Sequence, residues 1–246
     1  MFNLKCIEIY ILFWYFNYMK ILVLNGSPKK RSDTMVLTNS FLLGIKSVNR
    51  DDINIEIINV IEKNIKPCLG CFKCWENKNA RCVIEDDQNE IIQKYIEADV
   101  IIFSFPLYGY AVPSHLKAVM DRFIPLNKMT IKEENGRAVH ERLVDLSKKQ
   151  AICIVGSGFP NFNDNFAGLR IMLDNYFLKK EINIFVSETP MLNVKEADPL
   201  TINLKNNMFI AGKEFIESGS ISKELIKKIE EPMLDFNTYT NIVNSL

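Results

Sequence analysis

The sequence predicts a doubly wound α/β fold with a five-stranded parallel sheet in the order 2-1-3-4-5. Short apolar runs alternate with amphipathic stretches through residues 19–198, which is the element order of a parallel sheet with crossover helices. The run Val100–Phe105 is almost continuously apolar, as expected for a central strand buried on both faces. The chain has 246 residues, enough for one domain with a substantial core.

The first strand-turn-helix unit opens this region. Residues 20–24 predict a strand that turns at Asn25-Gly26-Ser27, where the missing side chain of Gly26 lets the backbone turn sharply. Apolar residues at helical spacing then predict a helix from Thr34 to about Val48. Isoleucines alternate with polar residues through 53–57, which predicts a half-exposed second strand.

The remaining elements follow the same alternation. Residues 91–96 predict a helix, and Ser114 is expected to cap the helix that follows the third strand. Residues 129–149 are polar and carry the turn signal Asn135-Gly136, so they predict an excursion between a helix and a strand. The later elements are expected to be a strand at Ala151–Val155, a helix through Leu169–Tyr176, a strand at Ile182–Val186 and two amphipathic helices from about Pro199.

The first eighteen residues differ from the rest of the chain. Residues 1–18 are aromatic and apolar, but they are too short and too interrupted for a spanning helix and lack the cleavage site of a signal peptide. We interpret them as a misplaced gene start, with Met19 as the biological start. A peripheral membrane or dimer-contact segment is the alternative. Residues 19–198 then form the main domain, and 199–246 form a C-terminal helical extension.

Charge and cysteine content limit the classes of function. Lys+Arg and Asp+Glu both number 30, so the formal net charge is zero and we expect neither a nucleic-acid nor a membrane partner. Four of the 6 cysteines lie between Cys68 and Cys82, which favours metal or redox chemistry in a reducing, cytoplasmic setting over a disulfide scaffold. Cys153 is expected to be a small core residue. No Ser-His-Asp set or carboxylate pair stands out.

Hydroxyl groups gather at the first turn. Ser27, Ser32 and Thr34 place three hydroxyls, with backbone N–H groups, at the positive end of the coming helix, which suits a phosphate. The loop is neither a Walker loop nor a Gly-x-Gly-x-x-Gly dinucleotide loop. An ordinary polar turn with Ser and Thr as helix caps is the alternative.

The loops after the third and fourth strands are also unusual. Tyr108 and Tyr110 flank Gly109, and aromatic faces beside exposed backbone suit a flat heteroaromatic ring. Both tyrosines packing beneath the loop is the alternative. Gly156-Ser157-Gly158 follows the fourth strand at the same edge of the predicted sheet. A phosphate loop, a ring platform and a glycine loop together indicate a mononucleotide with a large ring, of which FMN is the natural candidate.

The cysteines form a second candidate site. Cys68, Cys71 and Cys74 are separated by two residues each, and Cys82 follows after seven. Three thiols at this spacing can wrap one side of a [4Fe–4S] cubane, and the fourth closes it. Four thiolates also satisfy zinc. Free thiols or regulatory disulfides, with FMN as the only cofactor, are the third alternative.

Three motifs resemble a known family. Gly26-Ser-Pro-Lys-Lys-Arg-Ser-Asp-Thr34 resembles the phosphate loop of NADPH-dependent FMN reductases. Pro106-Leu-Tyr-Gly109, with the following Leu116-Lys117 and Asp121-Arg122, is similar to the flavin-ring loop and helix of that flavodoxin-like family. The cysteine spacing resembles that of the iron-sulfur flavoproteins, a branch of the family in which four thiolates bind a [4Fe–4S] cluster. The resemblance spans roughly residues 19–190.

The resemblance implies roles for individual residues. Ser27, Ser32 and Thr34 would hold the FMN phosphate, assisted by Lys29 or Arg31. Asp33 departs from the common family form, and its side chain is expected to point away from the phosphate. Lys117, Asp121 and Arg122 are expected to fix a helix and a dimer face. The residues expected to border the isoalloxazine are Pro106, Leu107, Tyr108 and Gly109, with Gly156 and Ser157 across it. The metal ligands implied are Cys68, Cys71, Cys74 and Cys82.

These expectations lead to one main functional hypothesis and two others. The main hypothesis is an FMN-dependent NAD(P)H oxidoreductase that passes electrons to a quinone, flavin, nitro compound or iron centre and forms a homodimer or higher homo-oligomer. The alternative is an iron-sulfur flavoprotein that carries a [4Fe–4S] cluster on the loop Cys68–Cys82 and accepts electrons from ferredoxin. A zinc-bound structural or sensing module without enzymatic activity is the third hypothesis.

Overall fold

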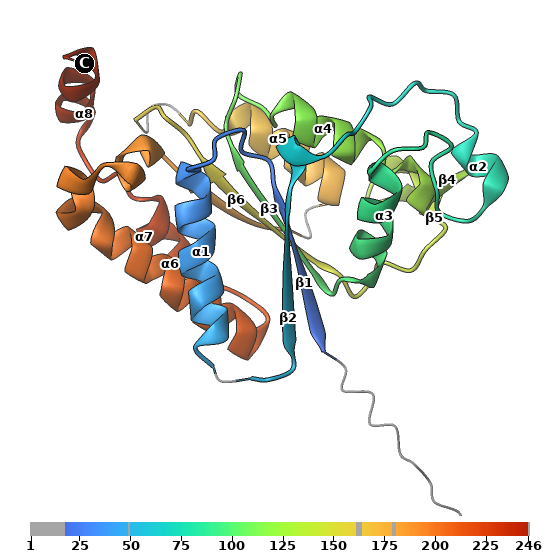
Figure 1. Ribbon diagram of the computed structural model, residues 1–246, viewed down its shortest axis with the longest axis horizontal. Coiled ribbons are helices and arrows are strands. Elements are labelled where there is room, and N and C mark those ends of the chain that lie inside the picture. The colour runs from blue at the N-terminus through green and yellow to red at the C-terminus, as the bar shows by residue number, and fades with distance from the viewer. Residues whose placement is uncertain (1–17, 49, 161–163, 179–180, 246) are drawn as a thin grey trace, which may run out of the picture.

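The computed structural model describes residues 18–48, 50–160, 164–178 and 181–245. A parallel sheet runs through the middle of the molecule, with helices on both of its faces (Figure 1). Its five strands lie in the order β2-β1-β3-β6-β7. This order confirms the predicted fold, because β6 and β7 are the fourth and fifth strands of the sheet along the chain. The strands are β1 (Met19–Asn25), β2 (Ile53–Asn59), β3 (Val100–Pro106), β6 (Gln150–Gly156) and β7 (Glu181–Val186).

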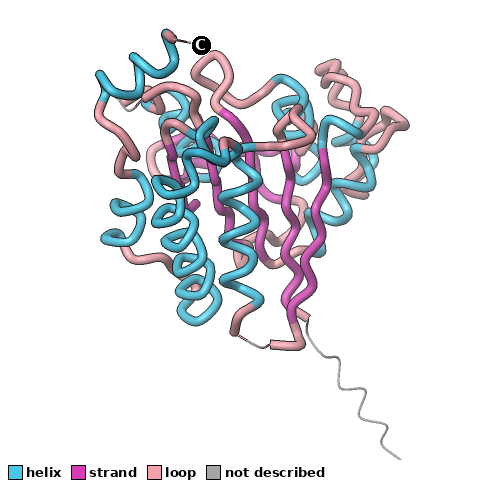
Figure 2. Tube along the Cα trace, turned by 60° about the vertical axis from the view of Figure 1, so that its left-hand side comes forward, coloured by secondary structure: helices cyan, strands magenta, loops and turns pink. Residues whose placement is uncertain are grey.

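The two faces of the sheet bury separate apolar clusters. Figure 2 shows helices layered against the strands of the sheet. Leu22 and Leu24 of β1 pack with helices α3, α4 and α5, whereas Ile21 and Val23 pack with α1, α6 and α7. Successive side chains of a strand point to opposite faces, so one central strand serves both clusters. The helices are α1 (Asp33–Lys46), α3 (Gln88–Glu97), α4 (Ser114–Asp121), α5 (Ala167–Phe177), α6 (Asp198–Ser218) and α7 (Lys223–Glu230).

Helices α1 and α6 touch backbone to backbone. A Cβ atom added at Gly44 would lie 1.9 Å from the Phe209 carbonyl oxygen, and one added at Gly212 would lie 1.9 Å from the Phe41 carbonyl oxygen. Each glycine therefore admits the other helix at a distance that no side chain permits. As a result α6 shares the buried cluster of α1 and the sheet rather than standing outside it. The boundary at residue 198 between a main domain and a C-terminal extension stays a prediction.

The C-terminal region contains three helices where the sequence led us to expect two. Helix α8 (Phe236–Asn244) follows α6 and α7. Pro232 comes soon after the end of α7, and the Asp235 side chain accepts a hydrogen bond from the Thr238 N–H at 3.0 Å, which caps a separate helix.

Residues 127–142 form a two-stranded hairpin, where the sequence predicted only a polar excursion. Strand β4 (Asn127–Glu134) pairs antiparallel with β5 (Arg137–Arg142), and Asn135 and Gly136 both have positive φ, as a tight hairpin turn requires. The side chains of β4 are mostly exposed, so the strand lacks the apolar alternation by which strands are predicted. Ser114 is also placed differently: it is the first residue of α4, and Pro113 occupies the cap position.

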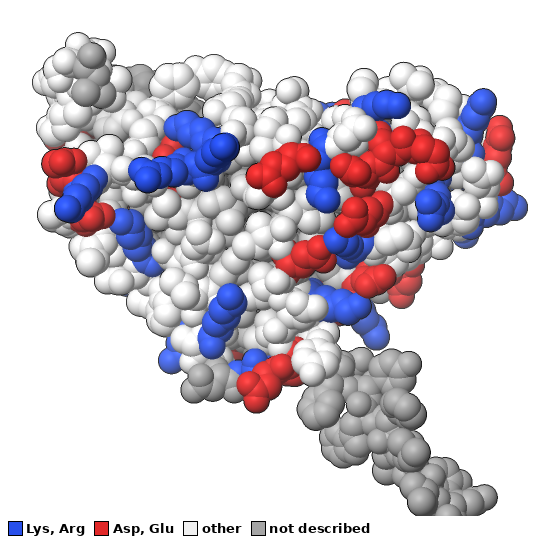
Figure 3. Space-filling model, viewed as in Figure 1, with Lys and Arg blue, Asp and Glu red and all other residues white. Residues whose placement is uncertain are grey.

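Two further expectations concern membranes and the start of the chain. None of the helices in the described part of the chain has the length and apolar composition needed to cross a membrane. The interpretation of residues 1–18 falls outside the described residues, except for Tyr18. Charged side chains of both signs are interspersed over the face in Figure 3, in agreement with the neutral charge balance.

The contact between α1 and α6 generates a stability prediction. Gly212→Ala should lower the free energy of unfolding by about 1–3 kcal/mol, because the new methyl group meets a backbone carbonyl that cannot move alone. The matched control is Gly168→Ala in α5, where the nearest atom to an added Cβ is 3.8 Å away. Urea unfolding of both variants checks this. Equal stabilities for the two variants would contradict the close contact.

Candidate functional site

Three loops meet at the carboxyl edge of the sheet. The Gly26 N–H donates to the Ser104 carbonyl at 2.8 Å, and the Leu107 N–H donates to the Gly156 carbonyl at 2.7 Å. The ring of His115 contacts the Gly26 carbonyl through Nε2 at 2.8 Å. These bonds hold together the ends of β1, β3 and β6, which is where the sequence predicted the site.

The first loop leads into the N-terminus of α1. Ser32 is the cap residue, and its hydroxyl accepts a hydrogen bond from the Met35 N–H at 3.1 Å. The Ser27 hydroxyl accepts from the Lys29 N–H at 3.3 Å. Ser27, Ser32 and Thr34 are all buried, at 3%, 6% and 1% exposure. The three side chains are therefore buried in the loop and first residues that form the positive end of the helix, with Ser32 serving as its cap.

Two charged residues of this loop, Lys29 and Asp33, form an ion pair. Asp33 contacts the Lys29 ammonium at 2.8 Å and accepts from the Asn193 amide at 2.6 Å, so its carboxylate is held by these two side chains. The hydrogen bond from Lys29 to Asp33 raises the pKa of Lys29. Lys29 is therefore already paired with Asp33, whereas Arg31 is exposed.

The second loop presents aromatic faces to solvent. Tyr108 and Ala111 exchange two backbone hydrogen bonds of 3.0 and 3.1 Å across a tight turn. Gly109 and Tyr110 have φ values of +55° and +61° in that turn. Tyr108 and Tyr110 are 45% and 57% exposed, so neither packs beneath the loop.

The third loop, after β6, contributes an aromatic ring that contacts the second loop. Phe159 stacks on Tyr110 with ring centroids 6.1 Å apart and planes inclined by 13°. Gly156 is constrained by its neighbours, because a Cβ there would lie 2.8 Å from Thr189 and 3.0 Å from the Thr34 hydroxyl. Ser157 is buried, and its hydroxyl accepts from the Phe159 N–H at 3.1 Å. The three loops thus place small residues and buried hydroxyls beside exposed aromatic rings.

A buried carboxyl group lies at the next loop, after β7. Glu188 is fully buried, and one of its oxygens accepts from the backbone N–H groups of Met233 and Leu234 at 2.8 and 3.1 Å. The other oxygen has no hydrogen-bond partner among the described residues. Burial raises the pKa of Glu188, and these hydrogen bonds only partly oppose the rise. Glu188 holds the segment before α8, whose Tyr239 hydroxyl donates to the Gly158 carbonyl at 2.7 Å.

The cysteines lie away from these loops. Figure 1 shows the chain leaving the end of β2 and running to α2 (Cys74–Asn77), near the hairpin. Cys68, Cys71, Cys74 and Cys82 line one cavity. Burial raises the pKa of the Cys74 thiol, and the neighbouring thiols, first that of Cys82, raise it further. No group of three or more ligating side chains in the described residues has a metal-binding arrangement.

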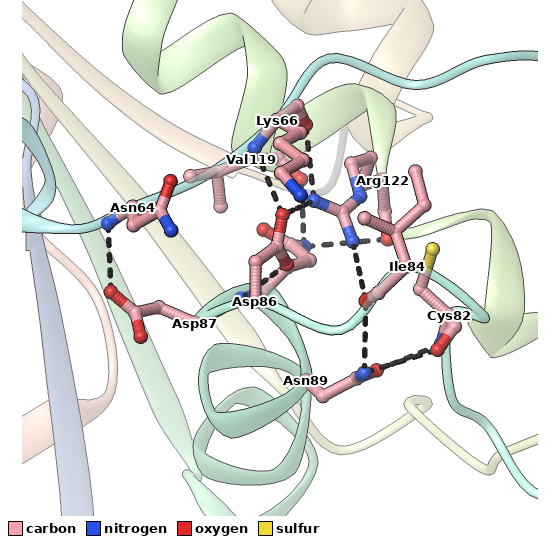
Figure 4. Close-up of polar contacts among 10 residues, drawn as sticks. Asn64, Lys66, Cys82, Ile84, Asp86, Asp87, Asn89, Val119 and Arg122 are labelled. Atoms are coloured by element: carbon pink, nitrogen blue, oxygen red, sulfur yellow. Dashed lines mark hydrogen bonds and ion pairs between the residues drawn. The ribbon is translucent and has the colours of Figure 1, made fainter.

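Arg122 closes the cysteine loop from the end of α4. Its guanidinium pairs with Asp86 and donates to the carbonyls of Lys66 at 3.0 Å and Ile84 at 3.3 Å (Figure 4). The side chains of Arg122 and Asp86 are 1% and 0% exposed. The expectation that Arg122 forms a dimer face is therefore wrong, because the side chain does not reach the surface. Lys117 and Asp121 do form an exposed ion pair along the helix.

Four thiols and one buried guanidinium line this cavity, although the thiols of the described residues do not have a metal-binding arrangement. Arg122 lines the cavity with the cysteines, and its Nε–H is buried without a hydrogen-bond partner among the described residues. A buried cationic donor suits the negative charge of thiolate ligands. Sequence reasoning found the four cysteines but not the Arg122–Asp86 pair, since nothing local to either residue indicates that they meet.

Comparison with known proteins agrees with this fold and these motifs. The sequence profile of the family described as NADPH-dependent FMN reductase matches residues 19–149. An iron-sulfur flavoprotein of Methanocaldococcus jannaschii is 37% identical over 108 residues, which cover 44% of this chain and 53% of the relative. One from Methanosarcina thermophila is 32% identical over 123 residues, covering 49% and 62%. The chain thus spans about half the length of the curated relatives it matches.

Solved structures share the architecture. An FMN-dependent NADH-azoreductase from Bacillus anthracis superposes with a TM-score of 0.56 at 19% identity, covering 82% of this chain and 99% of that one. An NAD(P)H:quinone oxidoreductase from Methanothermobacter marburgensis gives 0.57 at 15% identity, covering 80% and 96%. The fold and its loops define a flavodoxin-like α/β protein. The family profile covers more than half of the chain, so the protein belongs to the NADPH-dependent FMN reductase family.

Glu188 generates a pH prediction. Its pKa is raised in the folded protein, so the stability that it contributes is greatest below its ordinary value near 4.5 and is lost as the pH rises through the folded pKa. Glu188→Gln removes this loss and should therefore gain stability relative to wild type as the pH rises from about 4.5 to neutrality. Guanidinium unfolding at several pH values measures the difference. The exposed Glu224→Gln is the control, and a pH-independent difference for Glu188→Gln would contradict the assignment.

Proposed function

We propose that the protein is an FMN-dependent NAD(P)H oxidoreductase whose flavin site is formed by the loops after β1, β3 and β6. The observation that carries this proposal is the meeting of three buried hydroxyls at the N-terminus of α1 with an exposed aromatic turn at the same edge. Family membership supports it independently, because the profile spans the first two of these loops.

The phosphate would lie at the N-terminus of α1. Ser27, Ser32 and Thr34 would donate their hydroxyls, and the helix end would add its positive potential. Arg31 is an exposed cation of the loop and would approach the phosphate from solvent, whereas Lys29 would act together with its partner Asp33. The Asp33 carboxylate is held by Lys29 and Asn193, which limits its repulsion of the phosphate.

The ring would lie between the second and third loops. Pro106, Leu107, Tyr108 and Gly109 would border one side, and Gly156 with Ser157 the other. The bond from the Leu107 N–H to the Gly156 carbonyl fixes the separation of the two loops. When bound, FMN supplies the hydride and electron chemistry, and the chain binds and orients it. Solved structures of similar fold named as an NADH-azoreductase and an NAD(P)H:quinone oxidoreductase support nitrogenous or quinone acceptors.

The phosphate loop provides the test of this proposal. Ser27→Ala combined with Thr34→Ala should weaken FMN binding, because each lost hydrogen bond to a charged phosphate costs on the order of 1.5–3 kcal/mol. FMN fluorescence titration measures the affinity, and anaerobic bleaching of the bound flavin by NADPH measures hydride transfer. Ser40→Ala is the control, since that hydroxyl donates to the Val36 carbonyl within α1. Unchanged FMN affinity in the double variant would refute the phosphate position.

The cysteine cavity supports a second candidate function. We propose that Cys68, Cys71, Cys74 and Cys82 hold a [4Fe–4S] cluster that exchanges electrons with the flavin, as in an electron carrier that accepts from ferredoxin. The convergence of four thiols on one cavity favours this function, and so do relatives named iron-sulfur flavoproteins. Helix α4 begins after the ring loop and ends at Asp121, next to Arg122, so the two proposed sites would lie at opposite ends of a helix about 12 Å long.

Metal analysis tests the second function. Anaerobically purified protein should contain iron and sulfide and should absorb in the visible beyond the flavin bands. Cys71→Ser should lose the iron, whereas the buried Cys153→Ser should keep it. Colourless protein with stoichiometric zinc would instead support the zinc-bound module, and protein with flavin but no metal would leave FMN as the only cofactor.

A further inference from the structure

Arg122 fixes both ends of the cysteine loop. Its guanidinium donates to the Lys66 carbonyl, two positions before Cys68, and to the Ile84 carbonyl, two positions after Cys82. The loop between these points contains all four candidate ligands. One side chain from the end of α4 therefore determines how far apart the loop enters and leaves, whether or not the thiols hold a metal.

Asp86 holds the guanidinium in this position. The Asp86 carboxylate pairs with Arg122, and it also accepts from the Lys66 N–H at 2.9 Å and the Gln88 N–H at 3.1 Å. The fully buried Gln88 side chain donates to the carbonyls of Val119 and Arg122 at 3.1 and 3.3 Å, which ties the start of α3 to the end of α4. The Arg122–Asp86 pair is thus held by the packing of α3 against α4.

One N–H group of Arg122 has no hydrogen-bond partner among the described residues. An arginine carries five N–H groups, and in Arg122 the terminal nitrogens serve Lys66, Ile84 and Asp86. The Nε–H is buried without a hydrogen-bond partner in the described part of the chain, which is costly for a cation. The same side chain lines the cavity of the cysteines.

Cys82 lines the same cavity as Arg122. Figure 4 shows Cys82 beside Arg122, and the Cys82 backbone is itself held by Asn89, whose amide group accepts from its N–H at 2.8 Å and donates to its carbonyl at 3.0 Å. The two side chains are therefore fixed next to each other by separate contacts.

We propose that Arg122 is the positioning residue of an iron-sulfur centre on this loop: it holds the ligand loop closed through Lys66 and Ile84 and donates its Nε–H to the Cys82 sulfur. This inference rests on the second candidate function, not on the flavin site. A hydrogen bond to a ligating sulfur withdraws charge from the cluster and favours its reduced form. Arg122 therefore sets both the retention of the cluster and its reduction potential.

Two variants test this role in protein purified anaerobically with its iron. Arg122→Lys keeps the charge but loses the Nε–H and the fork. Arg122→Gln combined with Asp86→Asn removes both charges, so no unpaired carboxylate stays buried. Both should release iron to a chelator about 10- to 100-fold faster than wild type, and both should lower the reduction potential of the cluster. The control is Arg142→Lys, because Arg142 is exposed and bonds to Asn127 on the hairpin.

The outcomes separate this inference from the proposal on which it rests. FMN content and the melting temperature report whether each variant is folded. A variant that keeps both but assembles no cluster supports the role, because the defect is then confined to the cysteine loop. Folded variants with the wild-type release rate and potential overturn it, and faster release at an unchanged potential overturns the hydrogen bond to Cys82. Wild-type protein with zinc or no metal overturns the cluster and this inference together.

Discussion

The parallel direction of the strands is the constraint on which the whole site depends. Because β1, β3 and β6 run the same way, the turns that follow them share one edge, although up to 130 residues separate them in sequence. Backbone hydrogen bonds then pin the turns to one another, from Gly26 to Ser104 and from Leu107 to Gly156. The position of the candidate flavin site therefore follows from the sheet topology. Its side chains extend from loop backbones that the strands and these hydrogen bonds hold in place.

Sequence patterns predicted what depends on burial. The central strand at Val100–Phe105 is buried along its whole length, and such a strand needs a continuous apolar run on both faces. The same logic located Cys153, which is fully buried in β6. The patterns did not show that β4 is a strand, because its exposed side chains carry no apolar period. They also predicted two helices after about Pro199, whereas the described residues there form α6, α7 and α8.

The residues of the candidate site also divide into those that local sequence indicates and those that only distant contacts reveal. Ser27, Ser32 and Thr34 could be selected from sequence because a helix N-terminus is a local feature with a local chemistry. The arrangement of Asp33 with Asn193 could not, since 160 residues separate them and the contact depends on how the β7 loop folds back. Glu188 and Arg122 were missed or misplaced for the same reason. A buried charged side chain is stabilised by specific partners, and partners that are distant in the sequence are identified only from the structure.

The two glycines between α1 and α6 have a consequence for shortening the protein. Helix α6 covers α1 so closely that Phe41, buried in the present structure, would face water without it. A chain cut at residue 198 would leave an apolar stripe of α1 and one face of the sheet bare. Such surfaces associate, so we expect the truncated protein to aggregate rather than to behave as an independent flavin-binding core. Residues 199–246 thus cover part of the core, and we expect that the smallest soluble fragment has to include them.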